Sequence, residues 1–149
     1  MEHGKDRQPA VLQVQNLRIS FQTTAGKLRA VRGVDFTLHK GETLAIVGES
    51  GSGKSVSARA IAGMMSENEK IEEGSILYTY EKDGSTVTED ILKFSRKRRA
   101  KELYGKKIAM VFQDPMTALN PLLTIETQLT EGIRKHLSLS KKEAYKRGL

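Results

Sequence analysis

The sequence of 149 residues predicts an α/β fold, with a core of mostly parallel strands and a small antiparallel sheet beside it. Two continuous apolar runs, at 43–47 and 107–112, have the length and composition of buried parallel strands. Alternating apolar positions before residue 40 and a hairpin-type turn near residue 84 are typical of antiparallel strands. From residue 124 onward, helical spacing and capping residues replace both patterns.

The N-terminal part predicts a ribbon of two strands. Residues 1–9 are polar and end at Pro9, which indicates a loosely held leader. A mostly alternating apolar pattern follows and is strongest over residues 17–21. Residues 22–27 have the composition of a turn, and a second alternating run contains Val34, Phe36 and Leu38. We expect the two runs to pair and to deliver the chain, through residues 40–42, into the apolar run 43–47.

The segment 48–55 reads G-E-S-G-S-G-K-S and matches the P-loop pattern G-x-x-x-x-G-K-[ST] in full. It lies between the predicted strand 43–47 and a predicted helix over 55–65, which is the context that this pattern requires. Glycines let successive N–H groups turn toward an anion, and the start of a helix adds unpaired N–H groups and a positive dipole end. An accidental match in an ordinary Gly/Ser loop is disfavoured by this context.

The predicted ligands are ATP and Mg²⁺. We expect Lys54 to neutralise the β- and γ-phosphates and the Ser55 hydroxyl to ligate Mg²⁺, a hard ion that prefers oxygen. The other nucleotide-binding candidates in this stretch are Gly48, Glu49, Ser50, Gly51, Ser52, Gly53 and Val56.

Beyond the first helix, residues 67–74 form a polar connection and residues 75–80 predict a strand. A turn at 82–85 folds the chain back into a hairpin that extends to residue 88 and joins the N-terminal ribbon in the antiparallel sheet. The basic segment from about 90 to 103 predicts a surface helix, and 107–112 predicts the second buried strand. Thr124 is the expected N-cap of a further helix, and a capping box over 140–143 opens another.

The formal net charge of +7 allows two interpretations: a solvated basic surface, or attraction to nucleic acid or an anionic membrane face. Much of the excess lies in residues 93–101, where Phe94 is a lone aromatic side chain. Because interleaved aromatic residues are absent there, we favour the solvated surface and expect no nucleic-acid partner.

Other classes of site are excluded or disfavoured by composition. The absence of cysteine excludes disulfides, thiolate catalysis and Cys-type zinc sites. The histidines, His3, His39 and His136, have no metal-binding spacing. No apolar run approaches the roughly 20 residues of a membrane span, and the N-terminus lacks a signal-peptide pattern, so we expect a cytoplasmic chain.

Two stretches together resemble one family: 41–55, G-E-T-L-A-I-V-G-E-S-G-S-G-K-S, and 110–121, M-V-F-Q-D-P-M-T-A-L-N-P. The pair is similar to the ATP-binding subunits of ABC importers, and more narrowly to the oligopeptide/dipeptide (and nickel) permease branch. The resemblance covers essentially the whole chain. It implies uptake of peptides or a similar small solute, integral-membrane permease subunits and a second ATP-binding subunit as partners, and a peripheral position on the inner face of the cell membrane.

The resemblance also implies roles for individual residues. Gln113 matches the Q-loop glutamine, which ligates Mg²⁺, positions the attacking water and is the only catalytic candidate here. Phe21 aligns with the A-loop aromatic that stacks on adenine; the alternative is a core or edge-strand aromatic. Position 56 is Val where many relatives have Thr, which removes one hydroxyl contact to the α-phosphate.

By the same resemblance, the chain corresponds to the N-terminal part of one nucleotide-binding domain. Residues 1–9 are the leader, 10–113 the β-subdomain and P-loop core, and 114–149 the start of a truncated helical subdomain. The family's L-S-G-G-Q signature, its Walker B strand with the catalytic Glu and its switch His do not occur in the sequence. We therefore predict that this polypeptide alone binds ATP without efficient hydrolysis.

Three alternatives stay open. The first is an ABC-type ATPase acting on nucleic acid or the ribosome, which the positive charge favours and the stretch 110–121 disfavours. The second is a P-loop kinase or GTPase, for which no base-recognition or acceptor motif is present. The third is an inactive nucleotide-binding fragment that folds poorly.

Overall fold

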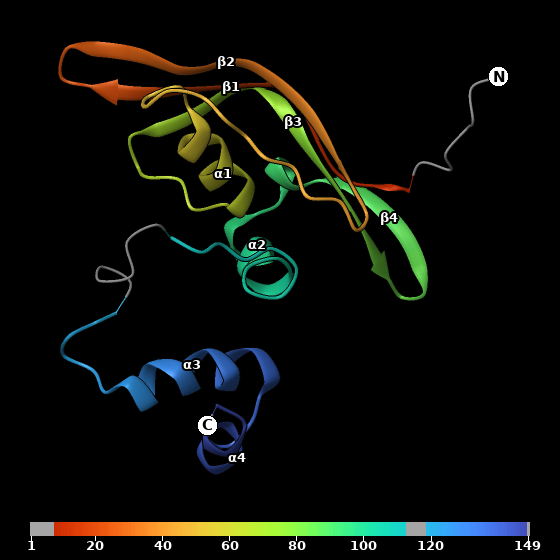
Figure 1. Cartoon of the computed structure of the whole chain (residues 1–149), viewed down its shortest axis with the longest axis vertical. Coiled ribbons are helices and arrows are strands. Elements are labelled where there is room, and N and C mark those ends of the chain that lie inside the picture. The colour runs from red at the N-terminus through yellow and green to blue at the C-terminus, as the bar shows by residue number, and fades with distance from the viewer. Residues whose placement is uncertain (1–7, 113–118, 149) are drawn as a thin grey trace. The chain divides into compact units, whose positions relative to one another are not determined.

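The computed structural model describes residues 8–112 and 119–148. These residues fall into two compact units, with the division after Lys101 (Figure 1). The first unit contains an antiparallel sheet and helix α1, and the second contains the helical hairpin α3–α4.

The first unit is built on a sheet of four strands in the order β2-β1-β3-β4, all antiparallel. The strands are β1 (Ala10–Thr23), β2 (Gly26–His39), β3 (Glu69–Lys82) and β4 (Ser85–Asp90). The predicted ribbon is confirmed as β1–β2 and the predicted hairpin as β3–β4. The predicted polar connection 67–74 is wrong from Glu69 onward, because these residues begin β3 and pair with the second half of β1. Asp83 and Gly84 both have positive φ in the hairpin turn, as a tight two-residue connection requires.

A β-bulge in the middle of β1 explains why its apolar pattern changes phase. Asn16 has a φ of 44°, and the β1–β3 register shifts between Gln15 and Arg18. The buried positions therefore change from even to odd numbers, namely Leu12 and Val14 before the bulge and Leu17 and Ile19 after it. Gly74 lies opposite, where a Cβ would come within 2.6 Å of the backbone oxygens of Gln15 and Asn16.

The core of this unit lies between the sheet and α1 (Lys54–Ala62), which contacts β1 and β2 (Figure 1). Its apolar side chains come from every element of the unit except β4 and α2; they are Leu12, Val14, Leu17, Ile19, Val31, Ala60, Ala62, Ile76, Tyr80, Ile91 and Phe94. Helix α1 ends where Gly63 adopts a left-handed conformation, three residues earlier than we expected. The loop that precedes α1 is thereby fixed at one end to a packed helix.

The two predicted parallel strands are wrong for the described residues. Residues 43–47 and 109–112 form no strand, and the only pairing near the second run is an isolated parallel bridge between Tyr104 and Ile108. Val47 is 87% exposed and Val111 is 95% exposed. A strand needs a neighbour for its N–H and C=O groups, and neither run has one in the described part of the chain. The sheet that does form is entirely antiparallel.

The basic segment is a helix broken in two: a 3₁₀ turn, η1 (Ile91–Lys93), and α2 (Arg96–Glu102). The buried, extended Phe94 separates them. Arg98 lies over the Phe94 ring, 3.5 Å from its centroid, and pairs with Glu89 at 2.7 Å. Arg99 donates to the carbonyl oxygens of Leu92 and Phe94. These two arginines therefore stabilise the fold.

The second unit contains α3 (Ile125–Leu137) and α4 (Lys141–Gly148). Both predicted helix starts are confirmed. The Thr124 hydroxyl accepts a hydrogen bond from the N–H of Thr127 at 3.2 Å. Ser140 and Glu143 form the capping box, in which the Glu143 carboxylate accepts from the N–H of Ser140 at 3.0 Å. No helix in the described residues is long and apolar enough to cross a membrane.

Candidate phosphate-binding site

The glycine-rich loop leads directly into α1, as the sequence predicts. Gly53 is the N-cap residue and no side chain caps the helix. The first turn of α1 contains no acidic residue, so its positive end is not neutralised by the chain itself. The N–H groups of Lys54, Ser55 and Val56 open the helix and have no intrahelical acceptor. This helix start has the properties of an anion site.

Gly53 allows the loop to lie directly against the sheet. Its φ is +94°, and a Cβ on it would lie 2.9 Å from the backbone oxygen of Ala30 and 3.1 Å from Cγ2 of Val31. Gly51 also has a left-handed φ, of +80°, but a Cβ there would meet nothing within 4 Å. The glycine requirement at position 53 is therefore both conformational and steric, whereas at position 51 it is conformational alone.

Lys54 folds back over the loop that precedes it. Its Nζ donates to the carbonyl oxygens of Gly48 at 2.7 Å and Glu49 at 2.6 Å, and lies 3.4 Å from Oγ of Ser52. These partners are all neutral, and no carboxylate pairs with Lys54 among the described residues. The ammonium charge is thus held at the centre of the loop without a counter-ion, which is the condition for attracting phosphate oxygens.

A cleft of about 690 Å³ connects the loop with the N-terminal ribbon. Its lining includes Phe21 from β1 together with Gly51, Ser52 and Val56 from the loop and α1. Phe21 is half-buried, so part of its ring faces the cleft. Two segments 30 residues apart line one cleft, and they contribute an aromatic side chain and part of the glycine-rich loop with α1. A nucleotide needs both chemistries.

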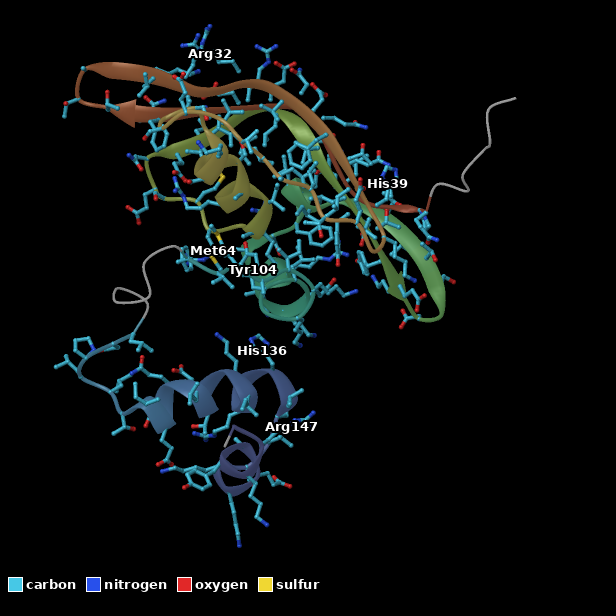
Figure 2. All side chains as sticks on the ribbon, in the orientation of Figure 1. Arg32, His39, Met64, Tyr104, His136 and Arg147 are labelled. Atoms are coloured by element: carbon cyan, nitrogen blue, oxygen red, sulfur yellow. The ribbon has the colours of Figure 1, made fainter. Side chains whose placement is uncertain are left out.

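The cleft also contains residues that the sequence analysis missed, namely Leu28, Arg29, Ala30 and Arg32. All four lie on β2, and Figure 2 marks Arg32 on that strand. In the β1–β2 register Phe21 is paired with Leu28. If Phe21 lies in the site, its cross-strand neighbour Leu28 lies there too. The predicted pairing of the two strands could therefore have indicated the β2 residues of the cleft. Arg29 and Arg32 are exposed and have no ion-pair partner among the described residues.

The remaining candidates differ in how far the structure places them. Gly48, Glu49, Ser50 and Ser55 are exposed around the loop, and the Ser55 hydroxyl has no hydrogen-bond partner in the described part of the chain. Gln113 lies outside the described residues. Within the described ranges no three His, Asp or Glu side chains cluster as a metal site. Mg²⁺ at Ser55 would therefore depend on phosphate oxygens for most of its ligands, as this ion commonly does.

The turn that leads into the loop is held by Glu42. Its carboxylate accepts from the N–H of His39 at 2.8 Å and lies 3.0 Å from Nδ1 of the same residue. The hydrogen bonds from His39, first the backbone one and then the side-chain one, lower the pKa of Glu42. The end of β2 and the segment 43–47 are thereby connected by a fixed turn.

Comparisons with known proteins identify the family to which the sequence is related. The family model described as ABC transporter matches residues 31–147. The dipeptide transport ATP-binding protein DppD of Bacillus subtilis (strain 168) is 47% identical over 137 residues, which are 91% of this chain and 38% of that protein. The oligopeptide transport ATP-binding protein OppD of the same organism is 45% identical over 141 residues, 93% of this chain and 37% of that protein. DppD of Lactococcus lactis subsp. cremoris (strain MG1363) is 42% identical over 140 residues, with 93% and 38% covered.

The chain thus spans less than two fifths of the length of these relatives. The family match begins within β2 and ends within α4, so it includes the glycine-rich loop and α1. It confirms the resemblance inferred from residues 41–55 and 110–121 and the P-loop NTPase class of the fold. The chain belongs to the ABC transporter family.

Proposed function

We propose that this chain is the nucleotide-binding part of an ATP-binding subunit that energises peptide uptake through a membrane permease. The observation that carries the proposal is the shared cleft, which is lined by Phe21 and by residues of a glycine-rich loop. Lys54 of that loop has no counter-ion among the described residues. The names of the relatives, which are dipeptide and oligopeptide transport ATP-binding proteins, support the solute class.

In this proposal two groups of residues at the site recognise two parts of ATP. Lys54 exchanges its contacts with the Gly48 and Glu49 carbonyls for phosphate oxygens, and the free N–H groups at the start of α1 add further donors. Phe21 and Leu28 provide the apolar surface for adenine. Ser55, with Gln113, supplies the protein ligands to Mg²⁺, and ATP bound there supplies the phosphoryl group.

We further propose that this polypeptide turns ATP over inefficiently by itself. Its sequence contains no L-S-G-G-Q stretch and no apolar strand that ends in paired acids. Phosphoryl transfer depends on positioned water and compensated charge, and the chain offers only Gln113 for the first of these roles.

The architecture and partners of the longer proteins extend the proposal. Segments 43–47 and 107–112 carry exposed apolar side chains, such as Val47 and Val111, and belong to no sheet in the described part of the chain. We propose that in a protein of the relatives' length they join a mostly parallel sheet, with residues 10–113 as core and 114–149 as the start of a helical subdomain. The partners would be permease subunits and a second ATP-binding subunit, at the inner face of the membrane.

The test is a binding titration with a fluorescent ATP analogue and Mg²⁺, comparing the chain with a Lys54→Ala variant. We expect at least a tenfold loss of affinity, because a charge-assisted contact to phosphate is removed. Lys70→Ala, which removes an exposed lysine on β3 outside the cleft, is the matched control and should bind like the unmodified chain. Equal affinity of the Lys54→Ala variant, or GTP binding tenfold tighter than ATP binding, would overturn the proposal.

A further inference from the structure

The helical hairpin of the second unit carries a concentration of unpaired positive charge. Six exposed cations lie at the end of α3 and along α4, here called the basic hairpin: Arg134, Lys135, Lys141, Lys142, Lys146 and Arg147. No side chain among the six pairs with a carboxylate in the described part of the chain. Glu143, the acidic residue of α4, is already engaged in capping Ser140.

The packing of the two helices leaves these charges in solvent. Ala144 is fully buried, and a Cβ on Gly148 would lie 3.2 Å from Cδ1 of Ile133 on α3. Lys142 and Lys146 are four residues apart and lie about 200° around the helix from Ala144. They therefore project from the face of α4 that is turned away from α3. Figure 2 marks Arg147 on α4 and His136 on α3.

The position of Lys141 and Lys142 shows that these two lysines do not serve helix stability. Lys141 and Lys142 lie in the first turn of α4, where a positive charge opposes the helix dipole. A solvated helix gains nothing from cations there, whereas a helix that contacts an anionic surface does. Arg134, Lys135, Lys146 and Arg147 lie in last turns and complement the dipole of their helix. The two lysines at the start of α4 are therefore the part of the basic hairpin that a partner explains better than the fold.

The apolar neighbours of these cations favour a lipid surface over nucleic acid. Leu137 is 47% exposed and Tyr145 is 44% exposed, and Leu139 between the helices is half-buried. Lysine and arginine beside exposed leucine and a tyrosine are typical of segments that lie in the headgroup region of a bilayer. Nucleic-acid binding by stacking would require more aromatic side chains than the single Tyr145.

We propose that the basic hairpin binds anionic phospholipid headgroups, so that the chain contacts the membrane surface directly. This proposal rests on the proposed function in one respect, since that function brings the chain to a membrane. The binding of lipid itself does not involve the nucleotide cleft. Clusters of four to eight cations near a helix suit such binding, and each contributes about a fivefold gain in partitioning at low salt. The contact should weaken as salt rises.

The experiment is co-sedimentation of the 149-residue chain with vesicles of phosphatidylcholine alone or with 30% phosphatidylglycerol. A variant with Lys141, Lys142 and Lys146 each changed to Gln removes three charges and keeps good helix formers. We expect binding only to the anionic vesicles, and a loss of about a hundredfold at low salt in the triple variant. Replacing the same lysines by Arg should preserve binding.

The matched control changes Lys40, Lys70 and Lys82 to Gln, which removes the same charge from exposed positions of the first unit. It should bind like the unmodified chain, and circular dichroism checks that both triple variants keep their helices. Equal loss in both variants, or equal binding to the neutral vesicles through exposed apolar residues, would overturn the proposal. So would tighter binding to a short RNA than to the anionic vesicles. A chain that binds anionic vesicles but no ATP would separate this proposal from the proposed function.

Discussion

Both the sequence motif and the tertiary structure require glycine at position 53. The P-loop pattern demands glycine there, and the structure supplies the reason, since a Cβ would meet the Ala30 backbone oxygen at 2.9 Å. That oxygen belongs to the backbone of β2, at an irregularity in its pairing with β1, and cannot rotate away as a side chain could. The motif therefore encodes the distance between the loop and the sheet as well as affinity for phosphate.

We predict that Gly53→Ala destabilises the chain more than Gly51→Ala. Both substitutions force a residue with a Cβ into a left-handed conformation, at a cost of about 1–2 kcal/mol. Only position 53 adds a backbone clash, so we expect a total loss of about 3 kcal/mol there. Urea denaturation followed by circular dichroism gives both free energies of unfolding. Equal losses at the two positions would contradict the close approach of loop and sheet.

At the scale of elements, a polar cluster attaches α2 to the β3–β4 hairpin. Glu89 on β4 accepts hydrogen bonds from Arg98 on α2 and from the Tyr80 hydroxyl on β3. The Arg98 hydrogen bond, followed by that from Tyr80, lowers the pKa of Glu89 from its usual 4.5. A carboxyl whose folded pKa is lowered stabilises the fold above its unfolded pKa, and this stabilisation is lost as pH falls through the folded value.

We predict that Glu89→Gln lowers stability at pH 7 and makes the chain less sensitive to acid. The side chains of Glu89 and Arg98 are about one-third exposed, so the loss at pH 7 should be modest, about 0.2–1 kcal/mol. Below pH 4 the difference between the variant and the unmodified chain should shrink, since Glu89 is then protonated. Denaturant midpoints at pH 7 and pH 3.5 measure both effects. If the difference in stability between the variant and the unmodified chain is the same at pH 7 and pH 3.5, the charge of the Glu89 carboxylate does not contribute to stability.

The local elements were predictable because each has a signal within a few residues. The β1–β2 ribbon, the hairpin turn at Asp83 and Gly84, and the caps at Thr124 and Ser140 all depend on short-range chemistry. The bulge at Asn16 was not foreseen, although the change of phase between Val14 and Leu17 encodes it. A β-bulge can be recognised from such a change in the apolar pattern only when the partner strand is also known.

For the whole molecule, prediction from the sequence was wrong where an element needs a pairing strand that lies far away in the chain. The apolar runs 43–47 and 107–112 predict burial, but burial requires a neighbouring strand that an apolar pattern cannot name. Only part of the lining of the cleft was predicted, because the rest depends on strand pairing. Phe21 and the loop were assigned from motifs, whereas Leu28, Arg29, Ala30 and Arg32 entered through the pairing of β1 with β2.

The state of those two runs yields a prediction for the whole chain, measured by hydrogen exchange of backbone amides. Strand β1 lies between β2 and β3, so its amides at Val14 and Ile19 should exchange slowly. The amides of Ile46 and Val47, which belong to no strand and carry exposed side chains, should exchange at least a hundredfold faster. Slow exchange at Ile46 and Val47 would contradict the structure of this segment, because slow exchange requires that the two amides be hydrogen-bonded to a neighbouring strand. It would then favour the parallel core that the sequence predicts, formed by this chain without further strands. Fast exchange would instead mean that the glycine-rich loop is positioned by α1 and by the contact of Gly53 with β2.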